Sequence, residues 1–457
     1  MAQHYKLKLG SFLIASTLSS LSYASGFAII EQSITGLGRA FAGSAAVADD
    51  ASTIFFNPAG LTYLSHSEFS TGLNFIKPES DFNNEGSTLP STLGGTAITG
   101  NGDNGGKLAL VPNLYYAHRL NDRMVAGIGI VAPFGLVTDY DDNWVGRYHA
   151  VKSDLKTVNI NPSFAFQTTE KLSLGFGINL QYADLELTQA VDFGAACAST
   201  AVSTNPAITT PLKELALECA DPQAHDGKAK ITADDWSWGY NLGLIFQATD
   251  ATRIALAYRS KISHHLHGKG TFDIPDNGAV QTVANIAGFA NGDTDGKVTL
   301  PETASFAVHH QINNKWAIMG DASWTRWSRF QDLTINSTDS VRLNSSKEEK
   351  WDNNMRYGLG LTYIHNDTWT FRGGIAYDQT PVSDQYRTPR IPDEDRKWLA
   401  IGASYKYSDN ITLDAGYTHI FVSDPSVNDT DDNGYTLKGN YNASVDILGM
   451  QMRWLFL

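Results

Sequence analysis

Residues Lys171–Tyr182, KLSLGFGINLQY, decide the fold, because apolar residues alternate one by one with small or polar residues along the whole stretch. One face of the stretch carries Leu172, Leu174, Phe176, Ile178, Leu180 and Tyr182. Residues 236–246 and 445–457 alternate in the same way. A period of two residues is the signature of a β-strand. A soluble β-sandwich and a membrane-spanning barrel both satisfy this alternation, so it predicts an all-β fold and leaves the architecture open.

The lengths of the connections between the strands distinguish these two architectures. Short polar turns are predicted at Asn121-Asp122, Thr169-Glu170, Asp250-Ala251, Asn313-Asn314, Asn366-Asp367 and Asp409-Asn410. Long loops are predicted near residues 79–106, 140–152, 192–228, 273–296, 336–347, 380–393 and 424–438. A transmembrane barrel has short turns on the periplasmic side and long loops on the outer side. The strict alternation of short and long connections therefore predicts a transmembrane antiparallel β-barrel of about fourteen strands.

The N-terminal residues have the features of an export signal. Lys6 and Lys8 form a basic region, an apolar run follows from Leu9 to Leu21, and Ser22-Tyr23-Ala24 is a small-x-small cleavage site. The apolar run is too short to cross about 30 Å of hydrocarbon as a helix. We therefore expect residues 1–24 to be a signal peptide and the rest of the chain to lie in the outer membrane. The formal net charge of −14 argues against a nucleic-acid partner.

The segment that follows the signal, residues 25–66, is rich in Gly and Ala and does not alternate. A barrel of about fourteen strands is wider than its own side chains can fill. We therefore predict that residues 25–66 form a plug, or hatch, inside the lumen, and that residues 67–457 form a monomeric barrel. Pro58 fixes its own φ and Asn57 can bond its own backbone, so Asn57-Pro58-Ala59 is predicted to be a rigid turn that anchors the plug against the wall.

Seven motifs spread over the chain point to one family. They are Gly36-Leu37-Gly38-Arg39-Ala40, Ala48-Asp49-Asp50-Ala51, Asn57-Pro58-Ala59, Tyr258-Arg259-Ser260, Trp327-Ser328-Arg329-Phe330, Trp369-Thr370-Phe371-Arg372-Gly373-Gly374-Ile375-Ala376 and Ile391-Pro392-Asp393-Glu394-Asp395-Arg396. Together they resemble the FadL family of outer-membrane transporters for long-chain fatty acids and hydrocarbons. The resemblance implies passive uptake of hydrophobic molecules, with hatch movement at Phe27 and Asn57-Pro58-Ala59 opening the path. Uptake of neutral aromatic or aliphatic hydrocarbons is the alternative within the family, and a general porin or a surface adhesin is the alternative outside it.

The third predicted strand, Met124–Thr138, contains an interruption. Pro133 removes a donor from the strand ladder and Gly135 offers no side chain to pack, so pairing is predicted to break or bulge at Pro133-Phe134-Gly135. The family resemblance implies a gap there, through which substrate leaves sideways into the bilayer. A hydrocarbon favours that route, because it gains about 0.8 kcal/mol for each CH₂ that enters lipid rather than water. A bulge that only sets the curvature of the barrel is the alternative.

The candidate substrate-binding residues lie near the predicted outer mouth. Leu185 and Leu187 face inward by strand parity, which suits an apolar ligand or, equally, packing under the loop that follows. The positions at which the family's fatty acid transporter carries basic residues near the bound carboxylate match Gln189 and Thr334, and neither is charged. Arg326, on the same strand face as Thr334, is the candidate replacement, and Phe330 completes the set. The expected partners are hydrophobic small molecules, outer-membrane lipid and lipopolysaccharide.

No motif predicts catalysis, a cofactor or a metal. His264-His265-x-His267 lacks the Cys or carboxylate partners of a zinc site, and the loop that begins at Asp429 has Asn440 where a calcium loop needs Glu. The two cysteines, Cys197 and Cys219, lie in one polar loop. In an oxidising compartment they are candidates for a disulfide, and two free thiols are the alternative.

Overall fold

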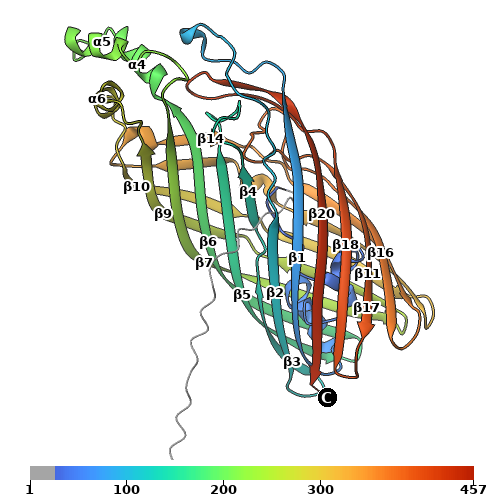
Figure 1. The fold of residues 1–457 in the computed structure, drawn as a ribbon. Helices are drawn as coiled ribbons and strands as arrows, with labels where there is room; N and C mark the ends of the chain where they lie inside the picture. Colours follow the sequence, from blue (N-terminus) through green and yellow to red (C-terminus); the bar gives the residue numbers. More distant parts are fainter. Residues whose placement is uncertain (1–25, 457) are drawn as a thin grey trace, which may run out of the picture.

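The computed structural model describes residues 26–456, which form a closed antiparallel β-barrel with a plug inside it (Figure 1). Twenty strand segments form one continuous sheet. Eight spans of the wall are single strands: β1 (Ser67–Asn84), β2 (Ala109–Arg119), β5 (Lys152–Thr169), β6 (Leu172–Asp192), β7 (Asp226–Thr249), β16 (Trp369–Asp378), β17 (Arg396–Lys406) and β20 (Thr436–Phe456). The predicted signal peptide, residues 1–24, lies outside the described residues.

Six further spans are interrupted, so each consists of two segments. They are β3 (Met124–Val131) with β4 (Gly135–Asp139), β8 (Thr252–Arg259) with β9 (Ile262–Asp273), β10 (Gly292–Leu300) with β11 (Thr303–Gln311), β12 (Trp316–Thr325) with β13 (Asp332–Asn336), β14 (Ser345–Glu348) with β15 (Asn354–Ile364), and β18 (Ile411–Val422) with β19 (Ser426–Thr430). The described wall therefore has fourteen spans, as the pattern of turns and loops predicts.

The barrel closes where the first strand meets the last. β1 pairs with β20 from Ser67↔Phe456 to Asn84↔Gly439. All six predicted short turns join neighbouring spans at one end of the barrel, which we call the turn end, and the long connections lie at the other, the loop end (Figure 1). Neighbouring spans are therefore joined alternately by a short turn at the turn end and by a long connection at the loop end.

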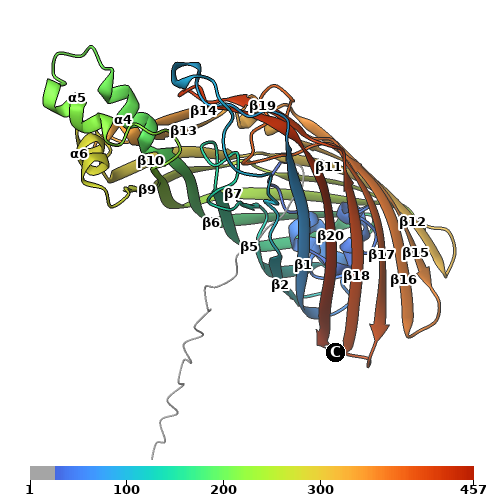
Figure 2. The same cartoon turned by 45° about the horizontal axis from the view of Figure 1, so that its top comes forward.

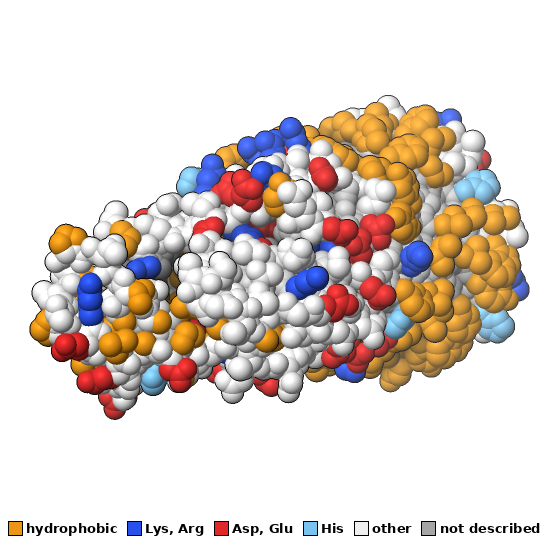
Figure 3. Space-filling model, turned by 90° about the horizontal axis from the view of Figure 1, so that it is seen from above, with side chains coloured by type: hydrophobic (Ala, Val, Ile, Leu, Met, Phe, Trp, Pro, Cys, Tyr) orange, Lys and Arg blue, Asp and Glu red, His pale blue; other side chains and the backbone are white. Residues whose placement is uncertain are grey.

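The outer wall carries a belt of exposed apolar side chains. Phe176, Ile178 and Leu180 of β6 are between 45% and 49% exposed, because they point away from the lumen. Charged side chains such as Asp184 follow on the same strand towards the loop end. Figure 3, which looks onto the loop end, shows acidic and basic side chains among the loops and apolar side chains on the flank of the barrel. Such a belt is what a lipid environment requires of a barrel surface.

The plug lies inside the barrel, towards the turn end (Figures 1 and 2). It consists of short turns of helix: α1 (Ile34–Leu37), α2 (Ser44–Val47), α3 (Thr53–Phe56) and η1 (Pro58–Tyr63). Nearly all of its side chains are buried, among them Leu37, Phe41 and Ile54. Glycines in the wall allow this close packing: a Cβ at Gly374 would overlap the backbone of Arg39.

Three helices from the long loops stand beyond the loop end on one side of the barrel (Figure 2). They are α4 (Phe193–Ala201), α5 (Thr210–Leu217) and α6 (Gly278–Ile286), which share a small apolar core. A disulfide joins Cys197 of α4 to Cys219, just after α5. The remaining helical turns are η2 (Ser91–Leu93), η3 (Trp327–Arg329) and η4 (Val341–Leu343). Within residues 26–456, no helix has both the length and the apolar character needed to cross a membrane.

Candidate functional site

The third span is broken at the predicted place. β3 pairs with both β2 and β5, but β4 pairs with β5 alone, which leaves Ala109–Asn113 of β2 paired with β1 only. Between the pairs Val131↔Asn159 and Gly135↔Lys156, the third span has three residues and β5 has two. One surplus residue therefore separates the span into two segments, and the prediction of a break at Pro133 is confirmed.

Side chains satisfy the backbone groups that the broken ladder leaves without partners. The N–H of Phe134 donates to Thr157 Oγ1 (3.0 Å), and the Thr157 hydroxyl donates to the carbonyl of Phe134 (2.6 Å). The side-chain amide of Gln32, in the plug, donates to the carbonyl of Ala132 (2.7 Å). Buried backbone groups without partners would each cost about 1–3 kcal/mol, so these contacts allow the break to persist.

The N-terminal part of the plug occupies the gap beside β4. Ile29 donates its N–H to the carbonyl of Pro133 (2.8 Å), and Gly135 donates to the carbonyl of Phe27 (3.0 Å). Ala28 and Phe134 form an antiparallel bridge. Residues 27–29 thus act as a short strand on the free edge of the break. These contacts fix the position of the Phe27 side chain.

Phe27 lies at the centre of an aromatic cluster. Its ring centroid is 4.7 Å from that of Trp327, 5.5 Å from Phe330, 5.6 Å from Trp351 and 6.2 Å from Phe134. All five rings are buried. The predicted residues Leu185 and Leu187 belong to the same apolar cluster. The structure therefore brings together Phe27, Phe134, Phe330 and the two leucines, which the sequence had placed in three separate groups.

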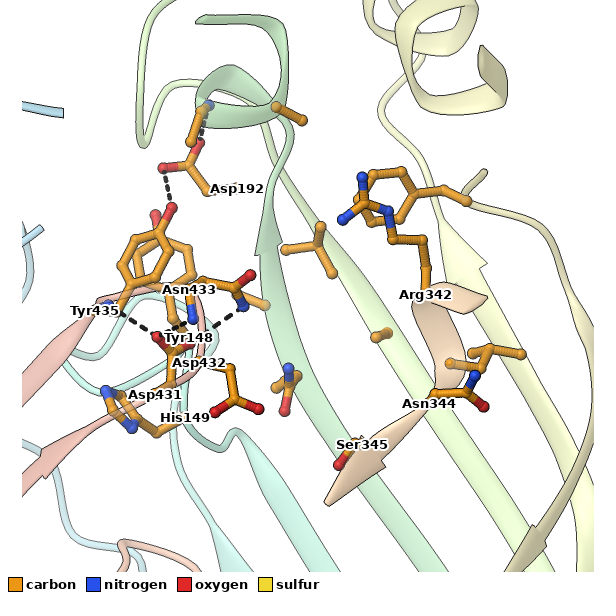
Figure 4. A pocket seen from close by; sticks show the side chains of 18 of the residues that line it. Tyr148, His149, Asp192, Arg342, Asn344, Ser345, Asp431, Asp432, Asn433 and Tyr435 are labelled. Atoms are coloured by element: carbon orange, nitrogen blue, oxygen red, sulfur yellow. Dashed lines mark hydrogen bonds between the residues drawn. The ribbon is translucent and has the colours of Figure 1, made fainter. Parts of the chain in front are cut away.

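A cavity of about 780 Å³ opens beyond this cluster at the loop end. Leu187 and Ile335 belong to both the cavity lining and the apolar cluster around Phe27, so the cavity borders the cluster. Figure 4 shows the rim: Asp431, Asp432 and Asn433 on one side and Arg342 and Asn344 on the other. A cavity of this size is in the range that holds one extended organic molecule.

Arg326 and Thr334 do not reach this cavity, and their assignment to it is corrected. The prediction that they share a strand face is wrong, because Arg326 lies in the interruption after β12, just before η3, whereas Thr334 lies in β13. Arg326 Nη1 forms an ion pair with Glu302 (3.2 Å), and the Thr334 hydroxyl bonds Asp332 (2.6 Å). The side chains that line the cavity here are the neighbours of Thr334, Leu333 and Ile335.

Gln189 does line the cavity, and it accepts a hydrogen bond from Nη2 of Arg390 (3.0 Å). Arg390 lies in the loop between β16 and β17, where strand parity gives no information about direction. The only signal in the sequence was its position immediately before the motif Ile391–Arg396. That motif also holds the start of the plug, because Asp393 accepts the N–H of Gly26 (2.9 Å).

The predicted turn at Asn57-Pro58-Ala59 is present and contacts the wall. Asn57 Oδ1 accepts the N–H of Ala59 (3.1 Å), and Asn57 Nδ2 donates to the carbonyls of Leu244 (3.2 Å) and Leu256 (3.4 Å) on β7 and β8. Pro58 occupies the first position of η1, where its missing N–H costs nothing. The turn therefore joins the plug to two neighbouring strands of the barrel.

An ion pair inside the plug also reaches the wall. Asp49 lies 2.6 Å from Nη1 of Arg39, within the plug, and 3.8 Å from Nε of Arg372 on β16. Arg259 of β8 donates to the carbonyl of Phe55 (2.8 Å). The base of the plug is thus fixed by charge and by hydrogen bonds, and its N-terminal end is held by the two backbone hydrogen bonds at the break, by side-chain hydrogen bonds of Asp393 and Gln32, and by apolar contacts.

Comparison with known proteins identifies relatives along almost the whole chain. The sequence model of the family described as "Outer membrane protein transport protein (OMPP1/FadL/TodX)" matches residues 15–456. The long-chain fatty acid transport protein of Escherichia coli (strain K12) is 31% identical over 415 residues, which cover 90% of this chain and 91% of that protein. Outer membrane protein P1 of Haemophilus influenzae is 33% identical over 409 residues, which cover 87% of this chain and 86% of that protein.

Solved structures agree with this assignment. A FadL homologue of Pseudomonas aeruginosa superposes with a TM-score of 0.84 at 25% identity, covering 94% of this chain and all of that one. The toluene transporter TodX of Pseudomonas putida shares the fold, with a TM-score of 0.64 at 19% identity over 89% of this chain and 94% of that one. The protein is an outer-membrane β-barrel, and it belongs to the OMPP1/FadL/TodX family of outer membrane transport proteins.

Proposed function

We propose that this protein takes up hydrophobic molecules across the outer membrane by diffusion, with long-chain fatty acids as the first candidate substrate. Substrate enters the cavity at the loop end, passes into the aromatic cluster around Phe27 and leaves sideways through the break at Pro133. One observation carries the proposal: the ladder of the wall is broken beside the apolar cluster, and the break is occupied by residues 27–29 of the plug rather than by a strand of the wall.

Substrate binding can supply the energy that displaces the N-terminal end of the plug. Two backbone hydrogen bonds hold residues 27–29 at the break, and each contributes about 0.5–1.5 kcal/mol net. Each methylene of a ligand that is buried in the cluster contributes about 0.8 kcal/mol. An acyl chain with about ten buried methylenes therefore gains more than these two hydrogen bonds contribute, and it competes with the Phe27 ring for the same aromatic surfaces.

The relatives support this class of substrate. The matching protein of Escherichia coli is named for long-chain fatty acids and is aligned along nine-tenths of the chain, which supports fatty acids as the first candidate. Neutral hydrocarbons are the second candidate, because a cluster of apolar side chains suits a neutral molecule as well as an acyl chain. The wall closes on itself through β1 and β20, so we propose that a monomer, surrounded by outer-membrane lipid and lipopolysaccharide, carries out transport.

Deletion of Pro133 tests the proposed exit. It would leave two residues in the third span opposite the two of β5, so the ladder from Val131 to Gly135 could become continuous. Cells that lack their own transporter would express the wild type, the deletion variant or Pro133→Ala, which keeps the residue count. We expect the deletion to reduce uptake of a labelled long-chain fatty acid at least tenfold while purified protein still binds it.

Two results would contradict the proposal in different ways. If the deletion variant took up substrate as fast as the wild type, the proposed lateral exit would be contradicted. An absence of uptake and growth on fatty acids and hydrocarbons with the wild-type chain at normal expression would remove the transport function itself.

A further inference from the structure

The cavity contains a positive charge that forms no ion pair with a carboxylate of residues 26–456. The Arg390 guanidinium donates to Ser153 Oγ (3.0 Å), to Gln189 Oε1 (3.0 Å) and to the carbonyls of Lys152 (3.3 Å) and Thr188 (3.5 Å). All four acceptors are uncharged, and within residues 26–456 no carboxylate oxygen lies within 4.0 Å of Arg390. Arg387, in the same loop, differs, since it pairs with Asp384 and Glu394.

Arg390 remains charged in this position. It lies in the loop between β16 and β17, beyond the apolar belt. Burial lowers its pKa to about 10, and the Glu349 carboxyl opposes this effect by raising the pKa. A pKa of about 10 still leaves the guanidinium protonated at pH 7. A partly buried cation without a counter-ion is costly, and an anionic ligand that reaches it removes that cost.

A second polar group in the same loop also lacks a partner. Thr388 is 4% exposed and lines the cavity, and its hydroxyl has no hydrogen-bond partner within residues 26–456. Thr388 precedes Arg390 by two residues in the sequence. A carboxylate accepts several hydrogen bonds at once, so one head group can bond both the guanidinium and the hydroxyl.

Two of the acidic residues at the rim of the cavity already have partners in the protein. Asp429 pairs with Lys347 and with His149 Nδ1 (3.1 Å), and the Asp431 carboxylate accepts the N–H groups of Asn433 (3.0 Å) and Tyr435 (2.8 Å). Figure 4 shows this side of the cavity, where dashed lines mark the hydrogen bonds to Asp431. None of the ion pairs of these two acids involves Arg390.

Apolar side chains lead from the positive site towards the aromatic cluster. Leu187 and Ile335 line the cavity and pack in the cluster with Phe27, and Ile231 lines the cavity beside them. A ligand with an anionic head and a long hydrocarbon tail matches this arrangement, whereas a neutral hydrocarbon leaves Arg390 without a counter-ion.

We infer that Arg390 binds the carboxylate of a long-chain amphiphile in this cavity, with Thr388 as a second donor and the hydrocarbon chain extending over Leu187 and Ile335 towards Phe27. This inference rests on the proposed function and names the head group that the same site recognises. Arg390 is thus a specificity-determining residue, and it enters from a loop rather than from the wall.

A matched pair of ligands separates the inference from the proposed function. Purified wild type, Arg390→Gln and Arg390→Lys would be titrated with a long-chain carboxylic acid and with the alcohol of the same chain length. We expect Arg390→Gln to weaken binding of the acid about tenfold or more and to leave the alcohol within about twofold. Arg390→Lys should restore part of the affinity for the acid. Arg326→Gln is the control, because Arg326 is a basic residue that does not line the cavity.

Thr388→Val provides a second variant if Arg390→Gln does not fold, since the Thr388 hydroxyl makes no hydrogen bond that folding would lose. It should weaken binding of the acid about threefold or more and leave the alcohol unchanged. Equal losses for acid and alcohol, or no loss for either, would overturn the head-group assignment and leave the proposed transport standing. Failure of the wild type to bind either ligand would overturn both.

Discussion

At the scale of single residues, Glu349 makes the cavity sensitive to pH. Glu349 lies in the short segment that separates β14 from β15, on the loop-end side of the exposed apolar residues of β15, and it lines the cavity and accepts a hydrogen bond from Trp351 Nε1 (3.0 Å). Burial raises its pKa to about 8, with Asp429 acting in the same direction and Trp351, Lys347 and Arg390 opposing it. The carboxyl is therefore mainly neutral at pH 7.5 and mainly ionised at pH 9, where its charge partly neutralises Arg390.

We accordingly expect affinity for a long-chain acid to fall severalfold between pH 7.5 and pH 9, while affinity for the matching alcohol stays constant. Equilibrium binding at the two pH values measures this change. Glu349→Gln should keep the affinity constant, because it removes the titrating group and retains the hydrogen bond from Trp351. A pH dependence that persists in Glu349→Gln would show that Glu349 is not the group responsible.

Strand parity predicts part of the site and fails where the chain leaves the strands. Leu187 and Gln189 line the cavity, as the alternation along β6 predicts, but Thr188 and Ala190 line it too, so alternation no longer separates the two faces near the end of this strand. Parity also fails for Arg326, because the span is interrupted between β12 and β13 before it reaches Thr334. The position of the Arg390 side chain depends on the packing of its loop against β5 and β6, and a periodic pattern in the sequence cannot predict such packing.

At the scale of elements, the contact between the plug and the wall depends on glycine. Gly175 of β6 is the register partner of Gly243 of β7, and together they face the turn at Asn57-Pro58-Ala59. A Cβ at Gly175 would overlap the backbone N of Ala59, and backbone cannot move aside as a flexible side chain does. Gly175→Ala should therefore displace the turn and destabilise the plug by about 1–3 kcal/mol.

Hydrogen exchange of the plug amides measures this effect, and exchange should quicken in residues 53–63 while the amides of β6 stay protected. Gly373→Ala is the matched control, since the nearest atom to a Cβ there is the carbonyl oxygen of Ala400 at 3.8 Å. Unchanged exchange in Gly175→Ala would show that the plug does not need this close approach.

The elements themselves were predicted unequally. The turns and spans follow from alternation and from short polar pairs such as Asn366-Asp367, because both are local properties of the chain. The break at Pro133 was predicted, since proline marks it directly. The interruption between β12 and β13 and the helices α4, α5 and α6 were not predicted, because they depend on contacts with distant segments such as Glu302 and the disulfide partner Cys219.

At the scale of the whole molecule, the plug and the wall are separate structural units that share one lumen. The ladder between β1 and β20 closes the barrel without any residue of the plug. Polar side chains such as Asn74, Asn113 and Asn159 point into the lumen and would be wetted if the plug were absent. The barrel should therefore fold without residues 26–64 and enclose a continuous aqueous channel.

Planar-bilayer recordings distinguish the hydrophobic-uptake function from that of a general porin. The intact protein should show no steady ion conductance, because the plug fills the lumen. It packs closely against glycines of the wall, and the ion pair of Asp49 joins it to Arg372 of β16. Deletion of residues 26–64 should open a stable conductance and abolish the selective binding of long-chain ligands, since Phe27 and the filled break are lost with it. Circular dichroism and heat-dependent gel mobility would verify that the deleted barrel is folded. A general porin would instead conduct ions steadily as the intact protein, and the deletion would not increase its conductance. An adhesin would bind its target equally well with and without residues 26–64. The three functions therefore give three different pairs of results from the same two proteins.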